Sequence, residues 1–202
     1  HTIPPHMVNY RANMWALHHH KVSGVISVAS VGSIRPDLQP GDIVLPHQII
    51  DYTWGRKSTM FDGNGTPVTH VDFTEPYDGE LRRRILAAGR QLSIDIKVDA
   101  VYAATQGPRL ETAAEINRLE RDGADVVGMT GMPEAILARE LGLPYAAINV
   151  VANHAAGRGS SVNGIHFESL EPVLHGAMGR VKAIVEKLVG STDSCQPMGM
   201  SV

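Results

Sequence analysis

The feature that most constrains the fold of this chain is a repeated alternation between β-branched apolar runs and amphipathic stretches. The apolar runs are predicted to be strands, over residues 22–30, 42–51, 100–105, 124–130 and 145–153. The intervening stretches are predicted to be helices, over residues 8–20, 76–92, 111–121, 133–141 and 167–188. Strands that are apolar throughout are typical of a sheet covered on both faces. The alternation therefore predicts an α/β fold in which helices flank a largely parallel central sheet.

The chain shows neither an internal repeat nor a linker, so we expect a single domain over residues 1–190. The Gly- and Asp-containing stretch 53–69 is predicted to be a long loop, and loops of this length are often functional. Residues 191–202 have no hydrophobic periodicity and are expected to form a disordered tail. The sequence begins at His1 without a Met, and we expect an N-terminal part of the protein to be missing.

The composition is that of an ordinary globular protein, with 43% hydrophobic residues, 19% charged residues and a formal net charge of -3. Without a basic excess, the chain is not expected to bind nucleic acid or an anionic lipid surface. It has no apolar run long enough to cross a bilayer, so we expect no membrane association. The single cysteine, Cys195, has no partner in the chain for a disulfide. These features predict a cytoplasmic protein and leave its activity open.

Small and polar residues gather where several of the predicted strands end, at 29–32, 105–109, 128–131 and 153–157. In open α/β sheets, ligands bind outside the carboxyl ends of the strands. Small residues with hydroxyl groups and unobstructed backbone N–H groups suit an anion. One such segment alone is more typical of a turn, so it is their combination that indicates a binding site.

A series of short motifs follows one order along the chain: HTIPPH at 1–6, VNYRAN at 8–13, PGDIV at 40–44, QGPR at 106–109 and GADVVGMT at 123–130. The series resembles the nucleoside phosphorylase family over about residues 1–190. It is most similar to the trimeric branch that holds methylthioadenosine, methylthioinosine and purine nucleoside phosphorylases. The resemblance implies the nucleoside phosphorylase fold, a single domain with a mixed, mostly parallel central sheet flanked by helices.

The resemblance also implies an enzyme, a pentosyltransferase that cleaves a small-molecule purine nucleoside in purine salvage. Inorganic phosphate would be its co-substrate, and no cofactor or metal ion is expected. The family assembles as a homotrimer with active sites at subunit interfaces, which we adopt as an expectation. Family members carry a Gly-rich phosphate loop and an Arg-His pair before the point where His1 stands here, and this is the segment that we expect to be missing.

Ser30 and Thr130 match positions that hold phosphate in the family, through a hydroxyl or a backbone amide. Ala29 stands where relatives commonly carry Thr or Asn, so one polar contact to phosphate is expected to be absent. Met129 matches the apolar residue beneath the ribose. On its own, Met129 would be equally consistent with a core methionine at a strand end.

Glu111 and Asn153 match base-binding, catalytic positions of purine nucleoside phosphorylases, where methylthioadenosine phosphorylases carry Ser and Asp. An ionised Glu can accept a hydrogen bond from N1–H of a 6-oxopurine, and an Asn amide can donate to O6 or N7. Adenine would instead set its N1 lone pair against the carboxylate. Ala155 replaces a second Asp of the adenine-specific enzymes, and Leu110 is also expected to contact the substrate. Alone, Glu111 could simply favour the dipole of the following helix.

The 5′ end of the sugar is predicted from three residues. His70 aligns with a His that reaches the 5′ group from a neighbouring subunit, although an ordinary loop His fits the sequence equally well. Phe167 and Leu170 fall near an apolar 5′ pocket, and both positions also suit the core side of a helix. Because burying an unpaired hydroxyl is costly, such a pocket favours S-methyl-5′-thioinosine over inosine or guanosine.

Three alternatives stay open at this point. An adenine-specific S-methyl-5′-thioadenosine phosphorylase is opposed by Glu111, Asn153 and Ala155. A nucleoside hydrolase would use water in place of phosphate. A catalytically impaired purine-binding protein would result if the chain truly starts at His1. A metal site is not expected at His18-His19-His20, because consecutive helix positions point in different directions.

Overall fold

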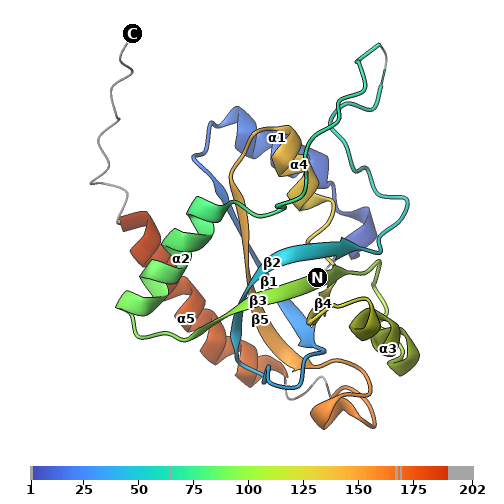
Figure 1. Cartoon of the computed structure of the whole chain (residues 1–202), viewed down its shortest axis with the longest axis vertical. Coiled ribbons are helices and arrows are strands. Elements are labelled where there is room, and N and C mark those ends of the chain that lie inside the picture. The colour runs from blue at the N-terminus through green and yellow to red at the C-terminus, as the bar shows by residue number, and fades with distance from the viewer. Residues whose placement is uncertain (1, 64, 167, 169, 191–202) are drawn as a thin grey trace.

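The computed structural model describes residues 2–63, 65–166, 168 and 170–190 (Figure 1). The strands in this part of the chain are β1 (Val25–Ser33), β2 (Ile43–Asp51), β3 (Ile96–Ala104), β4 (Val126–Gly128) and β5 (Tyr145–His154). The α-helices are α1 (Tyr10–His19), α2 (Gly79–Gln91), α3 (Ala113–Arg121), α4 (Glu134–Glu140) and α5 (Leu170–Gly190). Short 3-10 helices lie at η1 (Pro5–Met7) and η2 (Gly159–Ser161). No helix in the described residues is both long and apolar enough to span a bilayer.

The strands form one mixed sheet in the order β1-β4-β3-β2-β5, which closes into a barrel because β5 also pairs with β1. The pairs β1–β5, β2–β3 and β3–β4 are parallel, whereas β1–β4 and β2–β5 are antiparallel. The mixed, mostly parallel sheet is thus confirmed, and its closure is a feature that the sequence pattern did not predict. The parallel ladder from β1 to β5 brings the carboxyl ends of these strands to the same end of the barrel.

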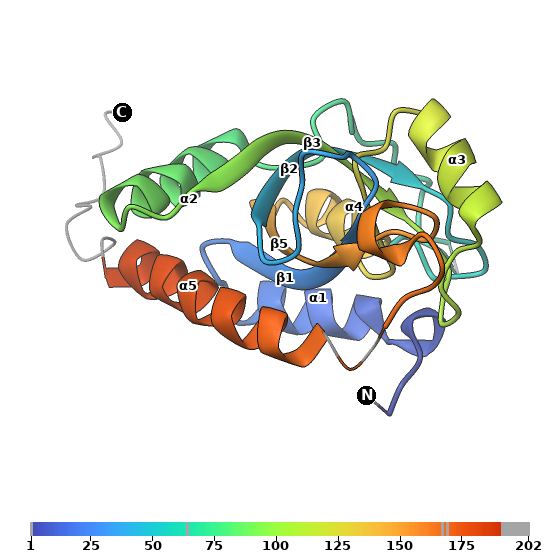
Figure 2. The ribbon, with the colours of Figure 1, turned by 90° about the horizontal axis from the view of Figure 1, so that it is seen from below.

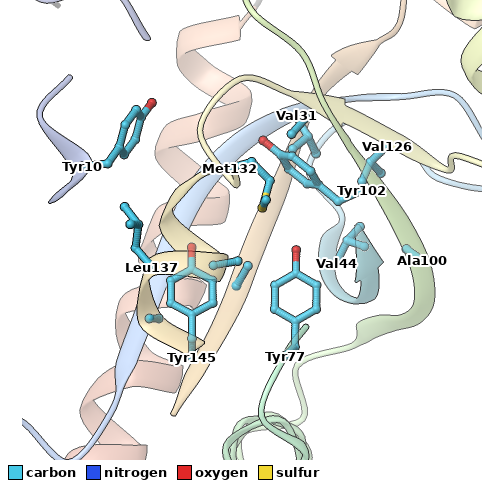
Figure 3. Packing of buried hydrophobic residues seen from close by; sticks show 14 of the residues in the cluster. Tyr10, Val31, Val44, Tyr77, Ala100, Tyr102, Val126, Met132, Leu137 and Tyr145 are labelled. Carbon is cyan, nitrogen blue, oxygen red and sulfur yellow. The ribbon is translucent and has the colours of Figure 1, made fainter. Parts of the chain in front are cut away.

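Helices cover the sheet on more than one side, which agrees with the mainly apolar character of its strands. Alternate residues of β5 belong to different clusters: Ala147 and Val151 pack with α1 and α4, while Ile148 and Val150 pack with α2 and α5. Figure 2 shows α2 and α5 lying side by side along one flank of the barrel. The cluster that packs α1 and α4 against the strands contains several tyrosines, as Figure 3 shows.

Helix starts differ from the predicted ones where a capping side chain begins the helix. The predicted helix at residue 76 begins instead at Gly79, because the Asp78 carboxylate accepts a hydrogen bond from the Leu81 N–H at 2.7 Å. The helix predicted from residue 111 begins at Ala113, because Thr112 and Glu115 form a capping box. Glu111 is therefore outside the helix, in the loop that precedes it.

The end of β1 is a correction to the sequence prediction, which placed Ser30 where the strand ends. β1 continues to Ser33, so Ser30 lies within the strand. The register shifts between Val31 and Gly32, and after this shift β1 also pairs with β4. Gly32 permits the close approach, because a Cβ there would stand 3.3 Å from the Val127 side chain and 3.4 Å from the Ala155 backbone.

Candidate active site

A pocket of about 720 Å³ opens at the carboxyl ends of β1, β4 and β5. It is lined by Thr2, Ile3, Pro4, Pro5, Val8, Val28, Ala29, Ser30, Val31, Gly32, Pro108, Leu110, Glu111, Val127, Gly128, Met129, Thr130, Ala152, Asn153, Ala155, Ile165, Leu170 and Leu174. Its size and its largely apolar lining with a few polar groups are typical of a small-molecule site. Several of these segments are far apart in the sequence. They meet here because each follows a strand, and these strands are neighbours in the barrel.

Most of the residues singled out from the sequence line this one pocket: Ser30, Leu110, Glu111, Met129, Thr130, Asn153, Ala155 and Leu170. His70 is exposed and is not among the lining residues. Its predicted role in a neighbouring subunit's site therefore stays a prediction. Phe167 and the predicted tail 191–202 lie outside the described residues.

The turn that carries Met129 and Thr130 crosses directly over the buried ring of Tyr102. The Thr130 N–H donates a hydrogen bond to the Tyr102 hydroxyl at 3.3 Å. A Cβ on Gly128 would collide with this hydroxyl, so a residue without a side chain is needed there. Burial raises the pKa of Tyr102 to about 12, so the phenol stays neutral beneath the pocket at physiological pH. The turn is thereby fixed to β3, the strand that carries Tyr102.

The carboxylate of Glu111 is half-buried and is held from the end of β3. The Thr105 hydroxyl donates to Glu111 Oε1 at 2.7 Å and also lies 3.2 Å from the Gly128 carbonyl oxygen. Because a carboxylate accepts several hydrogen bonds, Glu111 keeps acceptor capacity for a donor in the pocket. A ligand with an N–H group would suit this position.

The loop that carries Glu111 is closed by an ion pair. Arg109 donates to both carboxylate oxygens of Glu115, at 2.8 and 2.7 Å. These bonds, together with the Thr112 N–H, lower the pKa of Glu115 to about 2. A bidentate pair of this kind fixes geometry as well as charge. Gly107 adds a close contact with Met129, so the two pocket loops lie directly against one another.

Asn153 lies near the carboxyl end of β5, opposite Gly32 in the parallel ladder. Its Nδ2 donates to the backbone oxygen of His154 at 2.6 Å. An amide has two N–H donors and one acceptor oxygen, so this bond leaves one donor and Oδ1 for a ligand. The neighbouring Ala155 is 2% exposed and adds a methyl group to the wall. This side of the pocket therefore combines one polar amide with an apolar surface.

Arg56 is a residue of the site's framework that the sequence did not reveal. Its guanidinium donates to the carbonyl oxygens of Met129 at 2.8 Å, Met132 at 2.6 Å and Gln106 at 2.8 Å. It also lies over the Tyr10 ring, 5.6 Å from the centroid. Arg56 thus joins the two pocket loops to α1. A single Arg in a long loop belongs to no periodic pattern of residues. The sequence therefore predicted the loop but not the role of Arg56.

Among the described residues, no group of three or more His, Cys, Asp or Glu gathers as ligands for a metal ion. The consecutive histidines 18–20 are exposed at the end of α1, and Trp15 stacks on His19 at 4.9 Å between ring centroids. The polar groups that converge on the pocket are hydroxyl, amide and carboxylate groups from separate segments. These groups can form hydrogen bonds with a neutral heterocycle, and the hydroxyl and backbone N–H groups among them can donate to an anion.

The chain is similar to known proteins over most of its length. Residues 1–190 match the protein-family model described as Phosphorylase superfamily. The chain is 48% identical over 192 residues to a probable S-methyl-5′-thioinosine phosphorylase of Pseudomonas syringae, covering 95% of this chain and 77% of the relative. It is 50% identical over 162 residues to the 6-oxopurine nucleoside phosphorylase of Pyrococcus furiosus, covering 78% of this chain and 61% of the relative.

The fold is also similar to that of a solved structure, the methylthioadenosine phosphorylase from Schistosoma mansoni in complex with adenine. The TM-score is 0.90 at 30% identity, and the match covers 97% of this chain and 74% of that chain. The chain therefore spans between 61 and 77% of the length of these relatives.

Proposed function

The chain belongs to the phosphorylase superfamily, and we propose that its pocket is the active site of a purine nucleoside phosphorylase, a pentosyltransferase. The enzyme uses inorganic phosphate to split a 6-oxopurine nucleoside into free base and sugar 1-phosphate. The observation that carries the proposal is that Glu111 and Asn153 line the same pocket as Ser30 and Thr130. The relatives named for thioinosine and for 6-oxopurine nucleosides, at 48% and 50% identity, support the same substrate class.

The base is selected by complementary hydrogen bonds. The N1–H of hypoxanthine or guanine donates to the Glu111 carboxylate, and the free N–H of Asn153 donates to O6 or N7. Adenine has a lone pair at N1, so it would leave the carboxylate without a donor in a half-buried site. Unpaired polar groups of this kind discriminate between substrates by several powers of ten. Glu111 and Asn153 therefore favour a 6-oxopurine over adenine.

The reaction is a substitution at C1′ of the sugar. The bond from C1′ to N9 breaks and its electron pair leaves with the base, while a phosphate oxygen forms the new bond to C1′. Related transfers pass through an oxocarbenium-like transition state, which an adjacent phosphate stabilises. Ser30 and Thr130 would hold that phosphate, and Asn153 would stabilise the charge that develops on the departing base. The scheme needs inorganic phosphate and no further cofactor.

The 5′ substituent of the sugar is proposed to be a methylthio group. Leu170 and Leu174 of α5 and Ile165 add an apolar wall to the pocket. A methylthio group gains from burial against such a wall, whereas a 5′-hydroxyl would lose its water without a new partner. The preferred substrate is therefore S-methyl-5′-thioinosine, with inosine and guanosine as poorer ones.

We extend the proposal to the setting in which the enzyme works. Residues 1–190 form the phosphorylase domain of a cytoplasmic homotrimer that serves purine salvage. The exposed loop position of His70 would let it reach the 5′ group in a neighbouring subunit. These statements rest on the family resemblance.

The test is release of free base from methylthioinosine, inosine and methylthioadenosine by the full-length protein, each with and without phosphate. We expect phosphate-dependent release from both inosine compounds, fastest with methylthioinosine, and almost none from methylthioadenosine. Release that does not need phosphate would indicate a hydrolase. A preference for methylthioadenosine would contradict the assignment of Glu111 and Asn153 while leaving the family membership intact.

A further inference from the structure

We propose that Thr105 is a positioning residue that sets the base specificity of the pocket by orienting the Glu111 carboxylate. The inference rests on the proposed function, because it takes Glu111 as the acceptor for the base. The observation behind it is the hydrogen bond of 2.7 Å from the Thr105 hydroxyl to Glu111 Oε1. A bond to an ionised acceptor is stronger than one between neutral groups.

The hydroxyl of Thr105 is placed by the barrel and not by a loose loop. The residue directly follows β3, and its N–H donates to the Gly128 carbonyl oxygen at 2.8 Å. Its own carbonyl accepts from Arg56 Nη2 at 3.2 Å. Because both backbone groups of Thr105 are hydrogen-bonded, its side chain has a fixed position relative to the barrel and can hold the Glu111 carboxylate in place. Glu111 itself lies in a loop, so this bond connects the carboxylate to the rigid part of the fold.

The hydroxyl has one proton and two acceptors within reach, Glu111 Oε1 at 2.7 Å and the Gly128 carbonyl oxygen at 3.2 Å. The shorter distance and the negative charge both favour donation to Glu111. Arg109, the neighbouring cation in the sequence, directs its Nη atoms to the Glu115 carboxylate. The orientation of Glu111 therefore depends on a neutral donor, which does not cancel the charge that the base N1–H requires.

Such an arrangement explains how a carboxylate in a wide pocket can discriminate between bases. A carboxylate free to rotate could turn to solvent when adenine binds, and the mismatch would cost little. Held at Oε1 by Thr105, it presents its remaining acceptor sites to the base plane. An adenine N1 must then meet a fixed negative charge without a donor between them, which is the costly case.

The experiment uses Thr105→Val, which removes the hydroxyl at nearly constant volume, and Thr105→Ser, which keeps it. Each is combined with Glu111→Ala, which removes the acceptor of the Thr105 hydroxyl, in a double-mutant cycle. The readouts are the Kd of hypoxanthine by calorimetry, the KM for methylthioinosine and for phosphate, and the unfolding temperature. We expect Thr105→Val to weaken hypoxanthine binding roughly 10-fold, as loss of a hydrogen bond to a charged group predicts. The KM for phosphate should stay unchanged, and Thr105→Ser should restore binding.

In the Glu111→Ala background, Thr105→Val should have almost no further effect on hypoxanthine binding, because the side chain that it orients is gone. An equal loss in both backgrounds, or no loss in either, would overturn the inference. The proposed function fails separately, if the wild type binds hypoxanthine but releases no base from nucleosides with phosphate present. Failure of the wild type to bind hypoxanthine at all would overturn both.

Discussion

The end of the pocket around Glu111, which we propose binds the base and call the base end, is held by charged and hydroxyl side chains. The end that faces α5 is lined by apolar side chains. At the base end, Arg56, Arg109 and Thr105 tie the loops to each other and to the barrel. At the other end, Ile165, Leu170 and Leu174 offer apolar surface, and Ile3 beside them is 59% exposed. Hydrogen bonds constrain the direction of a ligand's polar groups, whereas apolar contacts mainly limit the size of its substituents. The two ends should therefore differ in how they select a substrate.

The difference predicts that the two ends respond differently to mutation. Substitutions at the base end should change which base is accepted, or should disturb the whole fold, because polar groups there depend on one another. Substitutions at the apolar end should change the relative kcat/KM for different 5′ substituents by smaller factors, because one methylene in an apolar pocket contributes only modestly to binding.

The largest effect is expected from Arg56→Ala. The change leaves the carbonyl oxygens of Gln106, Met129 and Met132 without this donor, and each partly buried acceptor that loses its partner is costly. We expect a loss of about 3 kcal/mol in the free energy of unfolding, measured by urea denaturation. Arg83→Ala is the matched control, because Arg83 is 74% exposed, and it should change stability by less than about 0.5 kcal/mol. Equal stability of the two variants would show that the hydrogen bonds of Arg56 do not stabilise the loops of the site.

A smaller and selective effect is expected from Leu170→Ala at the apolar end. The shorter side chain removes contact surface for a 5′-methylthio group, at a cost of about 1 kcal/mol, or roughly fivefold in kcat/KM. Inosine, which has a hydroxyl there, should lose much less. Steady-state kinetics with both nucleosides gives the ratio. A parallel loss with both would mean that Leu170 serves the core of α5 and not the 5′ pocket.

The smallest effect concerns acid stability at the base end. Glu115 has a pKa of about 2 in the folded protein and an ordinary value of 4.5, chiefly because of its hydrogen bonds from Arg109. A lowered pKa contributes stability above pH 4.5, and that contribution is lost as the pH falls from 4.5 towards 2. In Arg109→Ala, the urea midpoint should therefore fall less steeply over this pH range than in the wild type. Identical pH profiles would show that the pair, which is largely exposed, does not contribute to stability.

Much of the fold was predictable because the spacing of apolar residues in the sequence matches the buried strands and the apolar faces of the helices. Each predicted strand has a counterpart in the structure, since an apolar run such as 145–153 has few other ways to be buried. The boundaries were less accurate, because caps such as Asp78 and Thr112 act through single side chains. Closure of the sheet was not predictable, because it depends on antiparallel contacts between segments distant in sequence, such as β2 with β5.

The candidate site was predicted in part, for a related reason. Glu111, Asn153 and Thr130 were found through motifs that carry a resemblance, and they meet in one pocket. Arg56 was not found, and Thr105 was noted only as part of the segment 105–109. Their importance lies in contacts with backbone and side-chain atoms that only the folded chain brings together. The first strand was predicted to end at Ser30, although it continues to Ser33 and Gly32 serves close packing inside it.

The most direct test of the account is the ratio of kcat/KM for methylthioinosine to that for methylthioadenosine, measured with phosphate for the wild type and Glu111→Gln. Because we propose that Glu111 accepts from N1–H of a 6-oxopurine, we expect a wild-type ratio of at least about 10³ that falls by roughly 30-fold or more in the variant. A wild-type ratio near or below one, or a ratio that Glu111→Gln leaves unchanged, would contradict the central claim that this carboxylate selects the base.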